Sequence, residues 1–294
     1  MNLPSRCLLI LSSVVALSAC EDGRVSVELS ADRPAVAATQ QVVVQIAGVT
    51  LRRTDGSLDR YTFDDPLRVD LMRFDRNAFS LLGAEGLDEG EFNGIRVDFS
   101  DSDRSDTDNL VVDANGAQRP LDIVADDADF AALALKVNDN GRTYVVQTRL
   151  DLRLSLAANG DRRELRPVLR AARDSRAGQV SGSVRSSLIS ASSCRQNRNE
   201  GVGVAIYAFR GRDVTPNDAD GTEPAPLASA PVSRSGSSGD WSYTLPLLPS
   251  GDYTLALTCN GDIEDAARDD DLDFVGDTRS LTLDDGDEQD EDFN

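Results

Sequence analysis

Aspartate residues gather at three places along this chain, and carboxylate oxygens are the ligands that Ca²⁺ prefers in proteins. The first cluster follows a run of alternating apolar residues and comprises Asp101, Asp103, Asp106 and Asp108. These residues lack the ordered spacing of a known calcium-binding loop. Two interpretations stay open: a calcium site with these four ligands, or, as we prefer, a solvated loop that protects a strand edge from aggregation.

Two further acidic clusters lie in the second half of the chain. Asn217, Asp218, Asp220 and Gly221 resemble part of an EF-hand loop, but Pro216 and Leu227 occupy its first and twelfth ligand positions, so the match fails. The other cluster comprises Asp265, Asp269, Asp270, Asp271 and Asp273. We again prefer solvated loops and predict no cofactor, with calcium as the alternative.

The chain has no histidine, which excludes Ser-His-Asp and Cys-His catalysis and histidine-ligated zinc. It also has no glycine-rich phosphate loop or P-loop. A pair of carboxylates could hydrolyse a glycoside, but among 51 acidic residues some pair always suits that role. Trp241 and Tyr243 could stack on a sugar, although their alternation with Ser242 favours packing in a core.

The charge balance bears on the partners of the protein. The formal net charge is −21, from 30 basic and 51 acidic residues. Such a surface repels nucleic acids and anionic lipid headgroups. We therefore predict no nucleic-acid partner.

Apolar and polar residues alternate with a period of two through most of the chain, which is typical of strands with one buried face. The clearest case is Leu150, Leu152, Leu154 and Leu156, which predicts a strand with Asp151, Arg153 and Ser155 on its wet face. Only two short segments favour helix, 77–82 and 126–135. Turn pairs such as Asn159-Gly160 and Asp285-Gly286 separate the strands, whereas 214–231 is expected to be a long loop.

This pattern predicts an all-β protein of two β-sandwich domains. The boundary is expected near Ala171–Gly178, which gives domains of residues 24–175 and 176–294.

The first twenty residues resemble the signal of a bacterial lipoprotein. Arg6 precedes an apolar run from Leu8 to Leu17, too short to span a bilayer as a helix, and Leu17-Ser18-Ala19-Cys20 is similar to a lipobox. The resemblance implies a signal peptide of residues 1–19, lipidation at Cys20, and a short lipidated tether, 20–23. Glu21 in place of aspartate favours the outer membrane. Cleavage at Ala19, releasing a soluble periplasmic protein, is the alternative.

Export also bears on the remaining cysteines. Cys7 lies in the signal and Cys20 would carry the lipid, which leaves Cys194 and Cys259. An even pair in an exported chain predicts one disulfide.

The first half resembles a known family. The segments 42–100 and 148–170 carry motifs such as "LRVDLMRFDRNAFSLLG" and "TRLDLRLSLAANG", which are similar to bacterial lipoproteins defined by domain of unknown function 4382. The resemblance covers about residues 24–172, with Ala31-Asp32-Arg33-Pro34 where the family usually has Asp-Ala-Pro. The family has no established activity.

The second half resembles carboxypeptidase-regulatory-like domains through "GQVSGSV" (Gly178–Val184), "VGVAIYAF" (Val202–Phe209) and "GDWSYTLPLLPSGDYTLAL" (Gly239–Leu257). This resemblance implies an Ig-like, transthyretin-like sandwich without chemistry of its own. We therefore predict a lipid-anchored envelope protein that acts as a non-catalytic binding or structural module. Its expected partners are the membrane and an envelope protein or polysaccharide. The alternatives are a carboxylate-dependent envelope hydrolase and a carbohydrate-binding protein.

Overall fold

Alternating residues form strands through both halves of the protein, and the predicted all-β class is confirmed. The computed structural model describes residues 22–35, 39–100, 108–138, 141–190, 194, 203–235 and 240–294. In β8, for example, every second side chain from Ala131 to Val137 is buried. Within the described residues, no helix is long and apolar enough to cross a membrane.

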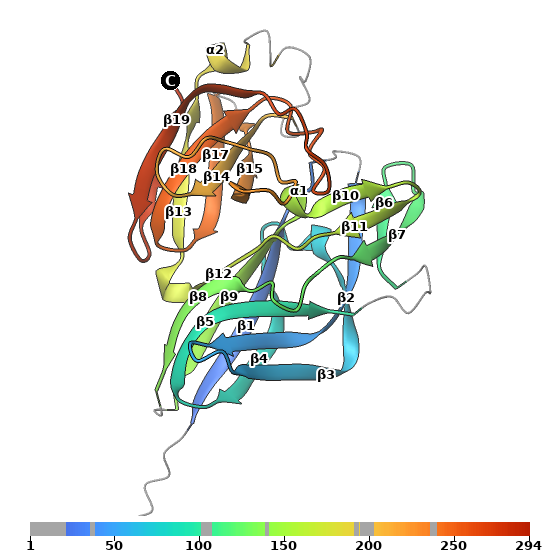
Figure 1. Ribbon diagram of the computed structural model, residues 1–294, viewed down its shortest axis with the longest axis vertical. Coiled ribbons are helices and arrows are strands. Elements are labelled where there is room, and N and C mark those ends of the chain that lie inside the picture. The colour runs from blue at the N-terminus through green and yellow to red at the C-terminus, as the bar shows by residue number, and fades with distance from the viewer. Residues whose placement is uncertain are drawn as a thin grey trace, which may run out of the picture.

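Two sheets build the first half of the chain (Figure 1). One is four-stranded in the order β12-β9-β1-β4, and the other is eight-stranded, running β10-β11-β7-β6-β2-β5-β8 with β3 paired to β2. Apolar side chains from both sheets form one core. The strands are β1 (Gly23–Asp32), β2 (Thr39–Arg53), β3 (Leu58–Asp70), β4 (Phe79–Leu87), β5 (Gly90–Phe99), β6 (Leu110–Asp113), β7 (Gln118–Ile123), β8 (Ala131–Val137), β9 (Thr143–Asp151), β10 (Leu156–Asn159), β11 (Arg162–Leu165) and β12 (Leu169–Arg173).

Two four-stranded sheets build the second half, in the orders β16-β17-β13-β20 and β15-β14-β18-β19. They enclose a separate core that includes Tyr253, Leu255 and Leu257. The strands are β13 (Gly178–Val184), β14 (Ala205–Arg210), β15 (Pro226–Pro231), β16 (Ser233–Ser235), β17 (Asp240–Leu248), β18 (Gly251–Thr258), β19 (Phe274–Leu283) and β20 (Glu288–Asp290). Short helical turns complete the chain: η1 (Leu71–Arg73), α1 (Leu152–Ser155), η2 (Asp174–Arg176) and α2 (Ser186–Ile189).

The first strand runs the length of the first half. At one end, Gly23 pairs with Leu87 of β4. A side chain at this position would clash with Val137 of β8. At the other end, Asp32 pairs with Asp151 at the end of β9. Ten extended residues at about 3.3 Å each place these ends roughly 30 Å apart.

Four segments differ from their predicted local structure. The segments 77–82 and 126–135 were expected to be helical but lead into β4 and β8, because pairing with neighbouring strands outweighs their weak helix propensity. The expected strand over Leu150–Leu156 stops at Asp151, turns helically through α1 and resumes as β10. The expected loop 214–231 ends in a strand, β15, which pairs with β14.

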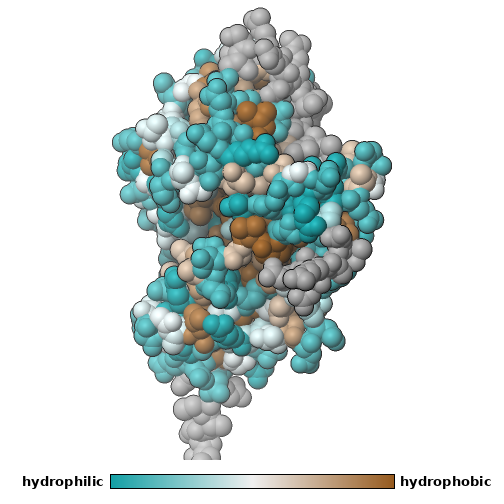
Figure 2. Space-filling model, turned by 45° about the vertical axis from the view of Figure 1, so that its right-hand side comes forward, coloured by the Kyte–Doolittle hydropathy of each residue, from teal (hydrophilic) through white to brown (hydrophobic). Residues whose placement is uncertain are grey.

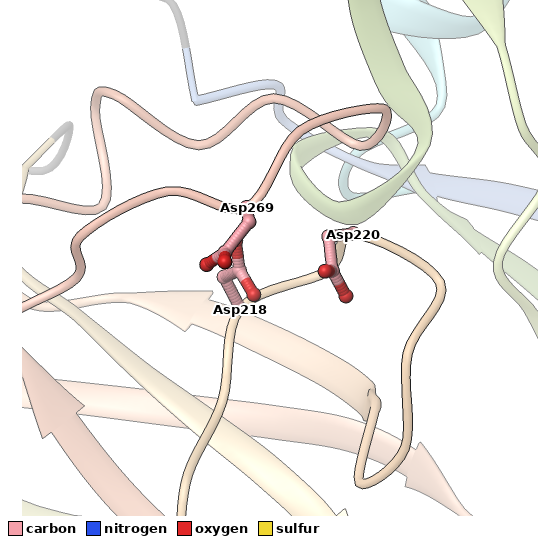
Figure 3. A group of neighbouring side chains, drawn as sticks. All are labelled: Asp218, Asp220 and Asp269. Carbon is pink, nitrogen blue, oxygen red and sulfur yellow. The ribbon is translucent and has the colours of Figure 1, made fainter.

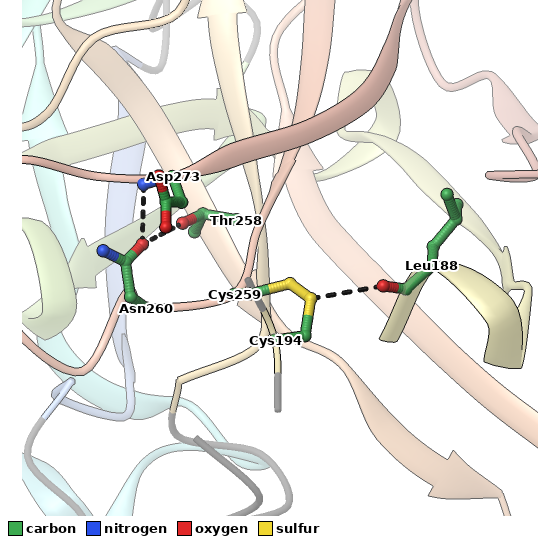
Figure 4. Close-up of a disulfide and its surroundings, with 6 residues drawn as sticks. All are labelled: Leu188, Cys194, Thr258, Cys259, Asn260 and Asp273. Atoms are coloured by element: carbon green, nitrogen blue, oxygen red, sulfur yellow. Dashed lines mark hydrogen bonds between the residues drawn. A yellow bond between two sulfur atoms is a disulfide. The ribbon is translucent and has the colours of Figure 1, made fainter. Parts of the chain in front are cut away.

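A disulfide joins Cys194 to Cys259, as the cysteine count predicts (Figure 4). Cys259 directly follows β18, and both residues are buried. The bond ties the segment after α2 to the edge of the second core.

Replacing both cysteines by serine should lower the free energy of unfolding by up to about 4 kcal/mol, because the closed loop spans 65 residues and restricts the unfolded chain. Urea denaturation of the oxidised protein and of the double variant measures the difference. Equal midpoints for the two would contradict this expectation.

Candidate functional site

Several residues singled out in the sequence lie outside the described part of the chain. Cys20, Asp101, Asp103 and Asp106 are among them, so the structure does not assess the lipobox or the first acidic cluster. Asp108 is described and half-buried. Its neighbour Asn109 is buried, accepts a hydrogen bond from Gln45 N at 2.6 Å and donates to Ser100 O at 2.9 Å.

Trp241 and Tyr243 are core residues, as their alternation favours. Both are buried, the Tyr243 hydroxyl donates to Glu291 O at 2.7 Å, and the Arg234 guanidinium covers the Trp241 ring. Neither ring is free to stack on a sugar, so this pair does not support carbohydrate binding.

The turn α1 contacts the second half of the protein, and Asp151 is the residue that caps its N-terminus. The Asp151 carboxylate accepts hydrogen bonds from the backbone of Arg153 and Leu154, which caps the turn. It also accepts from the backbone N–H of Ser229 at 2.5 Å and from the Ser229 hydroxyl at 2.9 and 3.0 Å. Since Ser229 belongs to β15, one fully buried carboxylate connects the two halves.

A buried arginine completes this contact. The side chain of Arg170 has no exposed surface and lies 2.7 Å from an Asp32 oxygen and 3.6 Å from an Asp151 oxygen. Its Nε donates to Pro246 O of β17 at 3.1 Å, and Asp32 also pairs with Arg149 at 2.6 Å. We call Asp32, Asp151, Arg170 and Ser229 the junction network.

Further contacts extend the junction toward the third acidic cluster. Leu154 packs with Tyr207 and Phe209 of β14. Arg153 is buried and donates to Gly261 O at 2.8 Å. Asp265 accepts from Ala158 N of β10 at 3.0 Å, so the loop between β18 and β19 lies against the first half.

The junction network changes the acidity of Asp151. Burial raises its pKa to about 6, and the neighbouring Asp32 charge acts in the same direction, whereas Arg170 and Ser229 oppose the shift. The folded protein therefore holds a proton that the unfolded chain releases from about pH 4 upward. Consequently, this residue makes the free energy of unfolding fall as pH rises toward 6.

The free energy of unfolding should fall less steeply with rising pH in Asp151→Asn than in the wild type, because asparagine does not titrate. Urea denaturation at several pH values between 4 and 7 measures the slope. An identical slope in both proteins would show that Asp151 does not contribute.

Ser229→Ala should lower the free energy of unfolding by about 1–3 kcal/mol, because it leaves a buried carboxylate without one of its donors. Ser233→Ala is the matched control, since Ser233 is exposed on β16. Chemical denaturation at pH 7 compares the two variants, and equal losses would argue against the junction network.

The second and third acidic clusters, at least 44 residues apart in sequence, meet in space. Asp218 and Asp220 lie on the loop before β15, and Asp269 lies on the loop between β18 and β19 (Figure 3). One carboxylate oxygen of each lies within 4.8 Å of the others, and Asp218, Glu264 and Asp270 form a second such triad. A pocket of about 460 Å³ opens beside them, lined by Asp218, Asp269, Asp270 and Asn217 among others. We call Asp218, Asp220, Glu264, Asp269 and Asp270 the acidic site.

Hydrogen bonds hold these loops in place. Asp270 N donates to Asp218 Oδ2, and Asp265 N donates to Asp270 Oδ2 at 2.7 Å. Asp220 accepts from Thr222 N at 2.7 Å. Glu264 accepts from the Tyr207 hydroxyl at 2.7 Å and from Ala219 N at 3.1 Å.

The acidic site disfavours its own ionisation. Burial raises the pKa of Glu264 to about 7, and the Asp218 and Asp270 charges add to this shift. Burial also raises the pKa of Asp218, where an Asp270 N–H opposes the shift and Asp220 and Asp269 reinforce it. Chemically, the arrangement can bind a proton or a cation.

Sequence reasoning missed two buried members of these sites and misplaced a third. Glu264 was not included in any cluster because it stands between Ile263 and Asp265 without a ligand spacing. Arg170 lies at the end of a family motif but gave no signal of burial. The alternation around Leu150 placed Asp151 in water, and only the interruption of that strand reveals its role.

A second pocket, of about 500 Å³, lies between the halves. Its lining includes Phe99, Phe130 and Leu227, with Arg96 and Arg210 among its polar residues. On one face of the molecule, hydrophobic residues gather in the middle between more hydrophilic upper and lower parts (Figure 2).

Comparison with known proteins confirms the family resemblance of the first half. Residues 22–167 match the family described as "Domain of unknown function (DUF4382)". No curated protein matches the chain.

Among solved structures, the chain is similar to a candidate adhesin from Bacteroides ovatus, with 13% identity, 85% of this chain and 74% of that chain covered, and a TM-score of 0.19. It is also similar to a candidate cell adhesion protein from Bacteroides fragilis, with 10% identity, 92% and 91% covered, and a TM-score of 0.19. TM-scores this low carry no argument about function.

Proposed function

We propose that this chain, whose residues 22–167 carry the domain of unknown function 4382, is a lipid-anchored, non-catalytic module of the bacterial envelope. Its first half is a rigid spacer that holds the carboxypeptidase-regulatory-like second half away from the membrane. The observation that carries the proposal is the course of β1, which runs from Gly23, three residues after Cys20 in the sequence, to the junction network.

The position of β1 supports the spacer function. Gly23 follows Cys20 by three residues. It lies at one end of the first half, beside the last residues of β4 and β8. The second half lies at the opposite end (Figure 1). A lipid on Cys20 would therefore keep the second half a distance of the order of the β1 length, roughly 30 Å, from the bilayer.

The junction network supports the rigidity of the spacer. A fully buried carboxylate with donors from both halves loses these donors if the halves separate, and an unpaired buried charge costs several kcal/mol. The orientation of the second half relative to β1 is therefore fixed.

The geometry of the acidic site supports a non-catalytic interpretation over the envelope hydrolase. Glu264 has the raised pKa of a general acid, but it is 5% exposed and both its oxygens accept hydrogen bonds within the protein. A general acid must reach the proton acceptor of a substrate, and these contacts hold Glu264 away from one.

The mature protein should begin at Cys20 and carry acyl chains, because the lipobox directs lipidation there. Intact mass spectrometry of the membrane fraction checks this, and Cys20→Ser should move the protein to the soluble fraction. A wild-type protein starting at another residue would contradict the anchor.

If the first half is a spacer, positions in the first and second halves should lie at different distances from the membrane. Asp88→Cys adds a thiol beside Leu87 at the Gly23 end, and Asp277→Cys adds one on β19 of the second half. Both positions are exposed, and the other described cysteines are joined in the disulfide.

In liposomes with an acceptor dye on the headgroups, energy transfer from a donor at position 88 should be strong and that from position 277 weak. Equal transfer from both positions would show that the second half lies on the membrane and would overturn the spacer.

A further inference from the structure

We propose that Asp218, Asp220 and Asp269 form a calcium site that joins the loop before β15 to the loop between β18 and β19. This inference does not depend on the lipid anchor or on the spacer. It assigns a ligand to two sequence clusters that, taken separately, fit solvated loops better.

The first argument is an unpartnered oxygen. Asp218 is 1% exposed, and its Oδ2 accepts from Asp270 N, but its Oδ1 is buried without a hydrogen-bond partner. An unsatisfied buried acceptor is costly, and more so when it is charged. This carboxylate lies next to that of Asp269, with Asp220 beside them (Figure 3), so a cation between the loops would satisfy it.

The second argument is the clustering of like charge. One carboxylate oxygen of Asp218 lies within 4.8 Å of those of Asp220 and Asp269, and a second such triad joins Asp218 to Glu264 and Asp270. Elsewhere, Asp32 and Asp122 are paired with arginines. Carboxyl groups this close to one another repel when they are ionised. A divalent cation would neutralise two of these charges and bind the folded state alone.

The chemistry of the donors favours Ca²⁺ over other ions. All the side-chain donors are hard oxygens, which excludes the soft-ligand metals. Ca²⁺ accepts six to eight oxygens in irregular geometry, whereas Mg²⁺ demands a near-ideal octahedron. The adjoining pocket, about 460 Å³, has room for the waters that would complete the shell, and Asn217 lines it.

Calcium at this site would also reach the junction. The loop that carries Asp269 carries Asp265, which accepts from Ala158 N of the first half, and Ala266, whose N–H donates to Leu156 O at 3.3 Å. Fixing this loop to the one before β15 therefore stabilises its contact with α1 and β10.

Calorimetric titration of the chelator-treated mature protein with CaCl₂ tests the proposal directly. We expect one ion to bind, with a dissociation constant of the order of 1 mM or below, the range of extracellular modules. In about 1 mM CaCl₂ the melting temperature should rise above its value in MgCl₂ or NaCl of equal ionic strength.

Variants locate the ion. Asp269→Asn changes an exposed side chain and should fold, yet it should weaken calcium binding by about tenfold or more. Asp218→Asn should abolish the calcium-specific rise in melting temperature. Asp277→Asn, an exposed aspartate of β19 outside the site, is the matched control and should bind as the wild type does.

Two results would overturn the proposal: the absence of a calcium-specific effect in the wild type, and unchanged binding in Asp269→Asn. If Asp218→Asn does not fold, Asp269→Asn alone decides. None of these results depends on the energy-transfer experiment, so the calcium site and the spacer can fail separately.

Discussion

The buried carboxylate of Asp151 is the constraint on which the relation between the two halves depends. It caps α1 from within the first half and accepts both Ser229 donors from the second. Because burying a charge without partners is far more costly than burying an apolar side chain, the halves meet in the one arrangement that supplies all these donors. Arg170 strengthens that arrangement, since it contacts Asp32, Asp151 and the β17 backbone at once.

From this point the structure extends in two directions. Along β1 it leads to Gly23 at the far end of the first half, and through β10 it leads to the loop that carries Asp265, Asp269 and Asp270. The two ionic sites differ in one respect. The junction network contains Arg170, which lies beside both of its carboxylates, whereas the acidic site consists of carboxylates alone. The second therefore has the composition of a ligand site.

The sequence predicts most of the fold because alternation reports burial directly. The strands at Val25–Leu29, Val42–Leu51 and Tyr253–Leu257 follow from it, as does the disulfide from the cysteine count. Alternation fails to predict burial where tertiary contacts, rather than the local pattern, determine which side chains are covered. The run from Leu150 to Leu156 alternates perfectly, yet Arg153 and Ser155 are as buried as the leucines, because a second half covers what would be the wet face. The acidic site escapes prediction for a related reason: its members come from loops that no local spacing connects, and only the pairing of β14 with both β15 and β18 brings these loops together.

The parallel pairing of β1 with β9 has a kinetic consequence. Arg24 pairs with Thr143 and Asp32 with Asp151, so this edge of β1 waits for more than a hundred later residues, whereas its other edge pairs with β4 much earlier in the chain. Contacts of such high sequence separation slow folding, since the entropy of closing the loop is lost before any contact is gained. The pairing of β1 with β9 is therefore a late step of folding, and the four-stranded sheet is complete only after β9 and β12 have been made.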